Sequence, residues 1–184
     1  MLRKATIDGR CRGRVAFFTW VCAWILLGQV YRVTAQDVPG NLQAAIFAKV
    51  FSYDKTIRKL DGEYRVVIVA SNEHQAEAKK LVGHFARIKV AARLATISSI
   101  SQEITNASAV YVFSADQAAA IEKLCVRHKV LSISGIADLA EDGRVAVSIG
   151  ISNRKPQIVI NFARTKREGQ AFSAQLLKLA RVLK

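Results

Sequence analysis

The chain has 184 residues, of which 51% are hydrophobic and two are proline. This composition excludes a disordered or collagen-like chain and is typical of one globular domain of ordinary size. The formal net charge is +14, from 28 Lys and Arg residues against 14 Asp and Glu residues. A charge of this size is compatible with an anionic partner, so its position along the chain matters.

Residues 1–35 have the pattern of a secretory signal peptide. Five basic residues precede Val15, and an uncharged, mostly apolar run extends from Val15 to Val30. The β-branched Val33 and the small Ala35 then form a site of the kind that a signal peptidase accepts, and we predict cleavage after Ala35. An uncleaved membrane anchor is the alternative, because the run approaches the ~20 residues that a spanning helix needs.

Cleavage would change both the charge and the cysteine content of the chain. It would remove six basic residues and one acidic residue, so that the net charge falls from +14 to +9. It would also remove Cys11 and Cys22 and leave only Cys125, which excludes an internal disulfide. The helical spacing around Cys125 favours burial over an intermolecular bond. The expected product is a single periplasmic domain of residues 36–184.

Helical and strand patterns alternate along the mature chain, without repeats or linkers. Helices are predicted over 41–51, 73–87 and 115–128, a helical turn over 99–104, and strands over 64–70, 88–97, 109–113 and 130–134. Asn41 and Asn72 stand where N-caps are expected, and Ser114 and Gln117 have the residue types of a capping box. The alternation predicts an α/β fold of three layers with a mainly parallel sheet.

The end of the chain departs from this alternation. Residues 145–151 and 157–161 are alternating apolar runs separated by a turn composition, which predicts an antiparallel strand pair added to the sheet. A final helix is predicted over 173–183. Its apolar side should dock on the body of the domain and consists of Phe172, Leu176, Leu179, Ala180 and Leu183.

Several segments resemble a known family. They are 130–140 (VLSISGIADLA), 145–149 (VAVSI), 156–161 (PQIVIN) and 172–181 (FSAQLLKLAR), together with 38–47 (VPGNLQAAIF) near the start of the mature chain. Together these segments resemble the YfiR family of exported bacterial proteins, and the resemblance covers nearly all of the mature chain.

The resemblance implies a periplasmic α/β protein without catalytic activity. The best-known member of the family contacts the periplasmic part of an inner-membrane diguanylate cyclase, represses it, and so lowers cyclic-di-GMP signalling and biofilm formation. The implied partner is therefore an inner-membrane sensor or signalling protein, with the membrane reached only through that partner; a homodimer stays open. Regulation of that member is linked to disulfides, which a chain with Cys125 alone cannot form internally.

The residues offer little for catalysis. The histidines lack metal-binding spacing, and Cys125 with His128 supplies only two of the four ligands of a structural zinc site. Ser132 to Gly135 lacks the flanking glycine of a nucleophile elbow, and no glycine-rich phosphate loop follows Val69. The sequence predicts no enzyme, no metal and no cofactor.

Small and polar residues end the predicted parallel strands, and they could line a crevice for a polar small molecule or anion. They are Ser71, Asn72, Ser114, Ser134 and Gly135. In open parallel sheets such a crevice lies beyond the carboxyl ends of the strands. A periplasmic small-molecule binding protein is therefore the alternative function. The same residues could equally be simple helix caps.

Basic residues gather near the C-terminus and could form one positive face for an acidic partner or for anionic lipid headgroups. They are Arg164, Lys166, Arg167, Lys178 and Arg181. The alternative is that they complement helix dipoles and keep the protein soluble. Nucleic acid is not expected as a partner, because most aromatic residues fall at core positions instead of alternating with the basic ones.

Overall fold

The computed structural model describes residues 38–184. The predicted signal peptide and the cleavage site after Ala35 lie outside these described residues. No helix within residues 38–184 has the length and hydrophobicity needed to span a bilayer.

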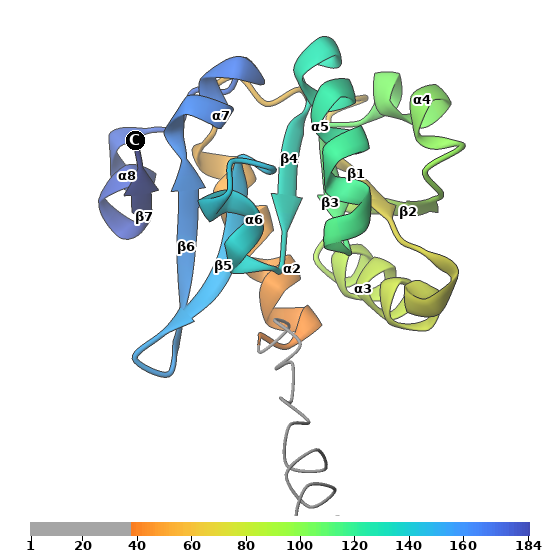
Figure 1. The fold of residues 1–184 in the computed structure, drawn as a ribbon, viewed down its shortest axis with the longest axis horizontal. Coiled ribbons are helices and arrows are strands. Elements are labelled where there is room, and N and C mark those ends of the chain that lie inside the picture. The colour runs from red at the N-terminus through yellow and green to blue at the C-terminus, as the bar shows by residue number, and fades with distance from the viewer. Residues whose placement is uncertain (1–37) are drawn as a thin grey trace, which may run out of the picture. The chain divides into compact units, whose positions relative to one another are not determined.

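The described chain alternates strands and helices (Figure 1). The strands are β1 (Arg65–Val69), β2 (Ala91–Ala95), β3 (Ala109–Val112), β4 (Leu131–Ser134), β5 (Val147–Ser152), β6 (Lys155–Asn161) and β7 (Arg181–Leu183). The helices are α2 (Gly40–Tyr53), α3 (Gln75–Arg87), α4 (Ile100–Glu103), α5 (Ala115–His128), α6 (Ala137–Glu141), α7 (Phe162–Arg167) and α8 (Ala174–Leu179). Short 3₁₀ helices cover Asn72–His74 and Ile104–Asn106.

All the strands belong to one seven-stranded sheet with the order β2-β1-β3-β4-β5-β6-β7. Every neighbouring pair is parallel except β5 and β6, which are antiparallel. The predicted mainly parallel α/β sheet with an antiparallel pair is therefore confirmed. The chain leaves β1 toward β2 and then returns to place β3 on the other side of β1, so that successive crossover helices cover opposite faces.

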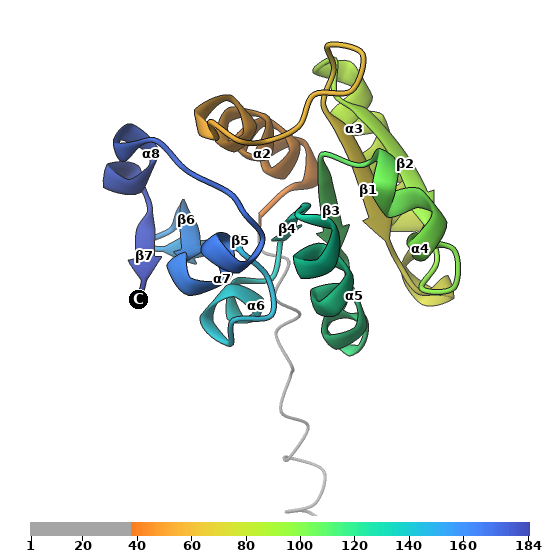
Figure 2. The same ribbon diagram turned by 90° about the horizontal axis from the view of Figure 1, so that it is seen from above.

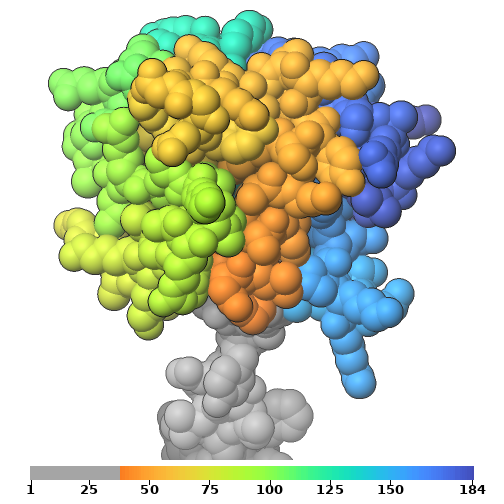
Figure 3. Space-filling model, turned by 180° about the vertical axis from the view of Figure 1, so that it is seen from behind, coloured from red at the N-terminus to blue at the C-terminus, as the bar shows by residue number. Residues whose placement is uncertain are grey.

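Helices pack on both faces of the sheet, which confirms the expected three layers (Figure 2). One face carries α2, α3 and α8, and the other carries α4, α5, α6 and α7. Alternating residues of β1 fill the two cores: Ile68 faces α2 and α3, whereas Val67 faces α5. Figure 3 shows the first of these faces, with α2 crossing its middle.

The β5–β6 hairpin closes through a two-residue turn. Ser152 pairs with Lys155, and the two residues between them, Asn153 and Arg154, have φ angles of 51° and 62°. Positive φ at both central positions is the geometry of a type I′ turn, whose twist matches that of the strands.

The predicted final helix is wrong beyond Leu179. Ser173 caps α8 by accepting a hydrogen bond from the N–H of Leu176, but the helix ends at Leu179. Residues Arg181–Leu183 then form β7, which pairs with β6. Leu176 is 1% exposed, whereas Leu179 is 67% exposed, so Leu179 does not dock. The unpaired edge of β6 offers backbone hydrogen bonds that the helical spacing does not reveal.

The predicted helix caps also differ from the structure. Asn41 lies inside α2, whose N-cap is Pro39, and Asn72 opens a 3₁₀ helix. Ser114 does hold the N-cap position of α5, but its hydroxyl caps no backbone N–H, so the capping box with Gln117 is not formed.

Candidate functional site

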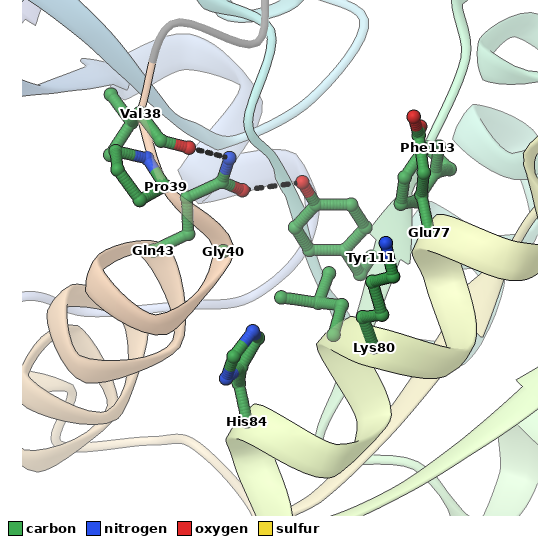
Figure 4. Close-up of a pocket in the computed structure, with 10 residues that line it drawn as sticks. Val38, Pro39, Gly40, Gln43, Glu77, Lys80, His84, Tyr111 and Phe113 are labelled. Carbon is green, nitrogen blue, oxygen red and sulfur yellow. Dashed lines mark hydrogen bonds between the residues drawn. The ribbon is translucent and has the colours of Figure 1, made fainter.

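A pocket of about 210 Å³ opens at the carboxyl end of β3, between the start of α2 and the side of α3 (Figure 4). We call it the strand-end pocket. Val38, Pro39 and Gly40 line it where α2 begins, and Tyr111 with Phe113 line it from β3 and the residue that follows. Its place agrees with the rule that ligand crevices in parallel sheets lie beyond the strand ends.

A chain of buried hydrogen bonds supports the pocket. The N–H of Gly135 donates to Oη of Tyr111 at 3.1 Å, and this hydroxyl donates to Oε1 of Gln43 at 2.6 Å. Nε2 of Gln43 then donates to the carbonyl oxygen of Val38 at 2.7 Å. The chain joins the start of α2 to the ends of β3 and β4. Burial raises the pKa of Tyr111 well above its usual value, so the phenol keeps its proton.

A glycine is required at position 135, next to these hydrogen bonds, because Gln43 and Tyr111 leave no room for a side chain. A Cβ atom added there would lie 2.5 Å from Oε1 of Gln43 and 2.6 Å from Oη of Tyr111. Both distances are far below a van der Waals contact. The sequence singled out Gly135, and its role in the structure is to admit two polar side chains.

The rim of the strand-end pocket is charged and comes from α3. Glu77, Lys80 and His84 line it, and their spacing of three and four residues places them along one side of the helix. The ring of His84 packs close to Gly40, where an added Cβ would lie 3.2 Å from Cδ2. The pocket thus has an aromatic wall and both signs of charge at its mouth. This arrangement suits a small molecule with an apolar body and charged ends.

The polar residues predicted for the crevice are not brought together. Ser134 is fully buried: its hydroxyl donates to the carbonyl of Val112 at 2.8 Å and accepts from the N–H of Ile136 at 3.1 Å. Asn72 is exposed and accepts from Nε2 of Gln75. Ser71 is outside the lining of the strand-end pocket.

Ser114 does not line this pocket either, and its buried hydroxyl makes no hydrogen bond to any described residue. None of the five predicted residues lines the strand-end pocket, and Gly135 supports it from beneath through the hydrogen bond of its N–H to Tyr111. Sequence reasoning missed Gln43, Lys80 and His84. The regular spacing along α3 is the one signal that could have indicated the last two.

Arg164 does not belong to an exposed basic face, which corrects the prediction. Its side chain is 1% exposed, with Nε 2.8 Å from Oε1 of Glu168 and Nη1 2.8 Å from Oε1 of Glu122. Glu168 also accepts hydrogen bonds from the N–H and the hydroxyl of Ser132. Arg164 and Glu168 therefore join α7 to α5 and β4 inside the protein.

The other predicted basic residues do not share one face. Lys166 and Arg167 are exposed on α7, which packs on the α5 side of the sheet, whereas Lys178 lies on α8, on the α2 side (Figure 2). Arg181 lies on β7 and pairs with Glu141 at 2.5 Å. The C-terminal charges are thus divided between the two faces and one edge of the sheet.

Cys125 is fully buried in the core on the α5 side, as the helical spacing predicted. Burial raises the pKa of its thiol, and the nearby Glu168 carboxylate raises it further. Within residues 38–184, no three side chains of the His, Cys, Asp and Glu types are grouped to hold a metal ion.

Solved structures with a similar fold include proteins of several bacteria. A conserved domain protein from Vibrio cholerae matches with a TM-score of 0.62 and 13% identity, over 79% of this chain and 60% of its own. A domain from Streptococcus pneumoniae described as an ABC domain in complex with L-Trp matches with a TM-score of 0.58 and 11% identity, over the same shares of the two chains.

A ligand-free, open substrate-binding protein with adhesive properties from Clostridium difficile has a TM-score of 0.53 and 10% identity, over 66% of this chain and 54% of its own. The chain thus spans about 60% or less of the length of these proteins, and at these identities the likeness concerns the fold. No curated protein matches the sequence. Residues 41–181 match the YfiR/HmsC-like family, and the chain therefore belongs to that family.

Proposed function

We propose that this chain is an exported, non-enzymatic regulator that binds the periplasmic part of an inner-membrane signalling protein of the diguanylate cyclase type. The observation that carries the proposal is the family match over residues 41–181. Periplasmic location is part of the proposal and depends on export through residues 1–35, with cleavage after Ala35.

Regulation would work by a shift of populations. The bound regulator stabilises one conformation of the signalling protein, and its release frees the other. A rigid regulator suits this role, because little ordering free energy is then lost on binding. The hydrogen bonds of Tyr111 and the hydrogen bond of Arg164 to Glu122 support such rigidity, since each joins elements that are far apart in the sequence.

The experiment that tests this function uses the native host. The gene is deleted, and intracellular cyclic-di-GMP is measured in the deletion strain and after complementation with the full chain. We expect deletion to change the cyclic-di-GMP level and complementation to restore it. A matched chain without residues 1–35 stays in the cytoplasm and should not restore it. Unchanged cyclic-di-GMP in the deletion strain would contradict the proposal.

A second function is favoured by the strand-end pocket: binding of a small zwitterion such as an aromatic amino acid. Its volume of about 210 Å³ is below the 300 to 1,000 Å³ typical of drug-sized sites, so the ligand must be small. Lys80 can pair with a carboxylate and Glu77 with an ammonium group, while Phe113 contacts the apolar part. Two proteins of similar fold are described as an L-Trp complex and as a substrate-binding protein.

Isothermal titration calorimetry with the twenty amino acids tests this second function. We expect an amino acid to bind and the Lys80→Gln variant to weaken its binding. Lys79→Gln removes the same charge from the next position of α3, which does not line the pocket, and should leave the affinity unchanged. Equal weakening by both variants would assign the effect to overall charge, and would contradict binding of the amino acid in the strand-end pocket.

A further inference from the structure

A second hollow is lined by residues of α5, α7 and the loop after α6. These elements lie on the face of the sheet opposite to α2 and α3 (Figure 2). The volume of the hollow is about 350 Å³. Three arginines and two acids contribute to its wall: Arg144, Arg164, Arg167, Glu122 and Asp142. We call it the arginine hollow. It shares no lining residue with the strand-end pocket.

The carboxylate of Glu122 lies near all three arginines, but it forms a hydrogen bond with only one of them, Arg164. Arg164 donates from Nη1 to Oε1 at 2.8 Å and from Nη2 to the backbone carbonyl of Glu122 at 2.7 Å. Nη1 of Arg144 and Nη1 of Arg167 lie 3.7 and 3.6 Å from the same carboxylate. Those distances exceed a hydrogen bond, so the contacts are electrostatic only.

The guanidinium groups of Arg144 and Arg167 therefore face the hollow, and most of their N–H donors make no hydrogen bond within residues 38–184. The side chains of Arg144 and Arg167 are 49% and 60% exposed, so an incoming group can reach them. Each guanidinium carries five N–H donors in a rigid planar fork, which matches the two oxygens of a carboxylate. An anion placed between Arg144 and Arg167 could accept the hydrogen bonds that these two arginines do not make to Glu122.

We propose that the arginine hollow receives the carboxylate of an Asp or Glu side chain from the periplasmic part of the signalling partner. This inference rests on the proposed regulatory function and names the chemistry of its contact. The buried Arg164, held by Glu168 and Glu122, forms the fixed wall, and Arg144 with Arg167 supply the donors.

The acids in the wall favour a carboxylate over a phosphate. Asp142 is exposed beside Arg144, and Glu122 lies between the arginines. A phosphate near neutral pH carries a charge of about −1.5 to −2, against −1 for a carboxylate, so Asp142 and Glu122 repel it more strongly. A planar, singly charged carboxylate fits these surroundings better than inorganic phosphate does.

The direct test titrates the ¹⁵N-labelled exported protein with N-acetylglutamate α-amide, which carries one side-chain carboxylate, at constant ionic strength. We expect shifts of the signals of Arg144 and Arg167. The variant Arg144→Gln with Arg167→Gln should weaken binding about tenfold or more, because charged hydrogen bonds are lost. Lys79→Gln with Lys178→Gln removes two charges elsewhere and should have no effect. Equal weakening by both pairs would overturn the proposal.

Competing anions are separate arms of this test. Inorganic phosphate and phosphatidylglycerol vesicles are titrated in the same way. Tighter binding of either one at the hollow would overturn the assignment to a carboxylate. Arg144→Lys with Arg167→Lys keeps the charge and loses the planar fork, so we expect intermediate weakening. That pair also keeps the test valid if the Gln variants fold poorly.

Complementation in the deletion strain separates this inference from the proposed function. If deletion leaves cyclic-di-GMP unchanged, the regulatory function fails. If deletion changes it and the chain with Arg144→Glu and Arg167→Glu restores it as fully as the wild type does, the function stands and the arginine hollow is not the contact. We expect the charge-reversed chain to be exported and to fail in restoration.

Discussion

Arg164 and Glu168 form an ion pair inside the protein, with Nε 2.8 Å from Oε1 and side chains that are 1% and 0% exposed. Glu168 directly follows α7, and it also accepts hydrogen bonds from the N–H and the hydroxyl of Ser132 on β4. Arg164 reaches Glu122 on α5. The pair therefore fastens the C-terminal segment to the centre of the sheet.

Replacing Glu168 with Ala should strongly destabilise the fold. The change removes the acceptor of Arg164 Nε and of the Ser132 N–H in a site without water access, and breaking a buried ion pair costs about 3 to 5 kcal/mol. Urea unfolding followed by circular dichroism measures the loss. Asp61→Asn breaks the exposed pair of Asp61 with Arg65 and should cost less than about 1 kcal/mol. Similar losses in the two variants would contradict this account.

The stability of the protein should depend on pH through Glu168. Burial raises the pKa of this carboxyl, and its hydrogen bonds with Ser132 and the charge of Arg164 lower it by less. A raised folded-state pKa contributes stability that is full below the ordinary value of 4.5 and is lost as the pH rises through the folded value.

We therefore expect the wild type to lose stability relative to Glu168→Gln as the pH rises above about 4.5. Urea unfolding of both proteins across the acidic to neutral range gives the difference at each pH. A wild type that gains on the Gln variant over this range would show that the attraction of Arg164 outweighs burial.

Much of this fold could be predicted because its signals are local. The apolar run of β1 reports its burial on two faces, and the alternating apolar residues of β5 and β6 indicate their strand structure. β7 could not be predicted, because Leu176 and Leu179 continue a helical spacing up to the strand. What ends the helix is the free edge of β6, which only the assembled sheet supplies.

The sites show the same division. The strand-end pocket lies at the carboxyl end of β3, but none of the predicted crevice residues lines it. Its polar floor uses Gln43, which is 68 residues from Tyr111. Arg164 and Glu168 have the spacing of an exposed helical ion pair, and their burial depends on Glu122, 42 residues before Arg164. Both the polar floor of the pocket and the burial of the ion pair depend on the packing of segments that are distant in the sequence, and no local sequence pattern indicates that packing.

Gly135→Ala should destabilise the strand-end pocket. The added Cβ would lie 2.5 Å from Oε1 of Gln43 and 2.6 Å from Oη of Tyr111, so at least one hydrogen bond must break, and overpacking of this kind costs about 1 to 3 kcal/mol. Gly83→Ala is the matched control, because nothing lies within 4 Å of its added Cβ on α3. It should stabilise by about 0.5 to 1 kcal/mol. Thermal unfolding distinguishes the two signs.

Tyr111→Phe tests the hydrogen bonds without adding volume. It leaves the Gly135 N–H without its acceptor and Gln43 Oε1 without its donor, and an unpaired buried polar group costs about 1 to 3 kcal/mol. Tyr53→Phe removes a hydroxyl from a half-buried ring that keeps its contact with Lys49, and it should be nearly neutral. Urea unfolding of both variants measures the difference. Equal effects would mean that the Tyr111 hydroxyl is not structural.

Cys125 should stay reduced and unreactive in the folded protein. Its side chain is fully buried, and burial together with Glu168 raises the pKa of the thiol, so the reactive thiolate is scarce. Iodoacetamide should label the exported protein only after urea unfolding, and non-reducing electrophoresis should show no disulfide-linked dimer. Ala174→Cys places a thiol on the exposed start of α8 and should be labelled at once in the folded state. Labelling of Cys125 at the rate of that variant would show that the core on the α5 side opens readily, and would allow redox coupling between two copies of the chain.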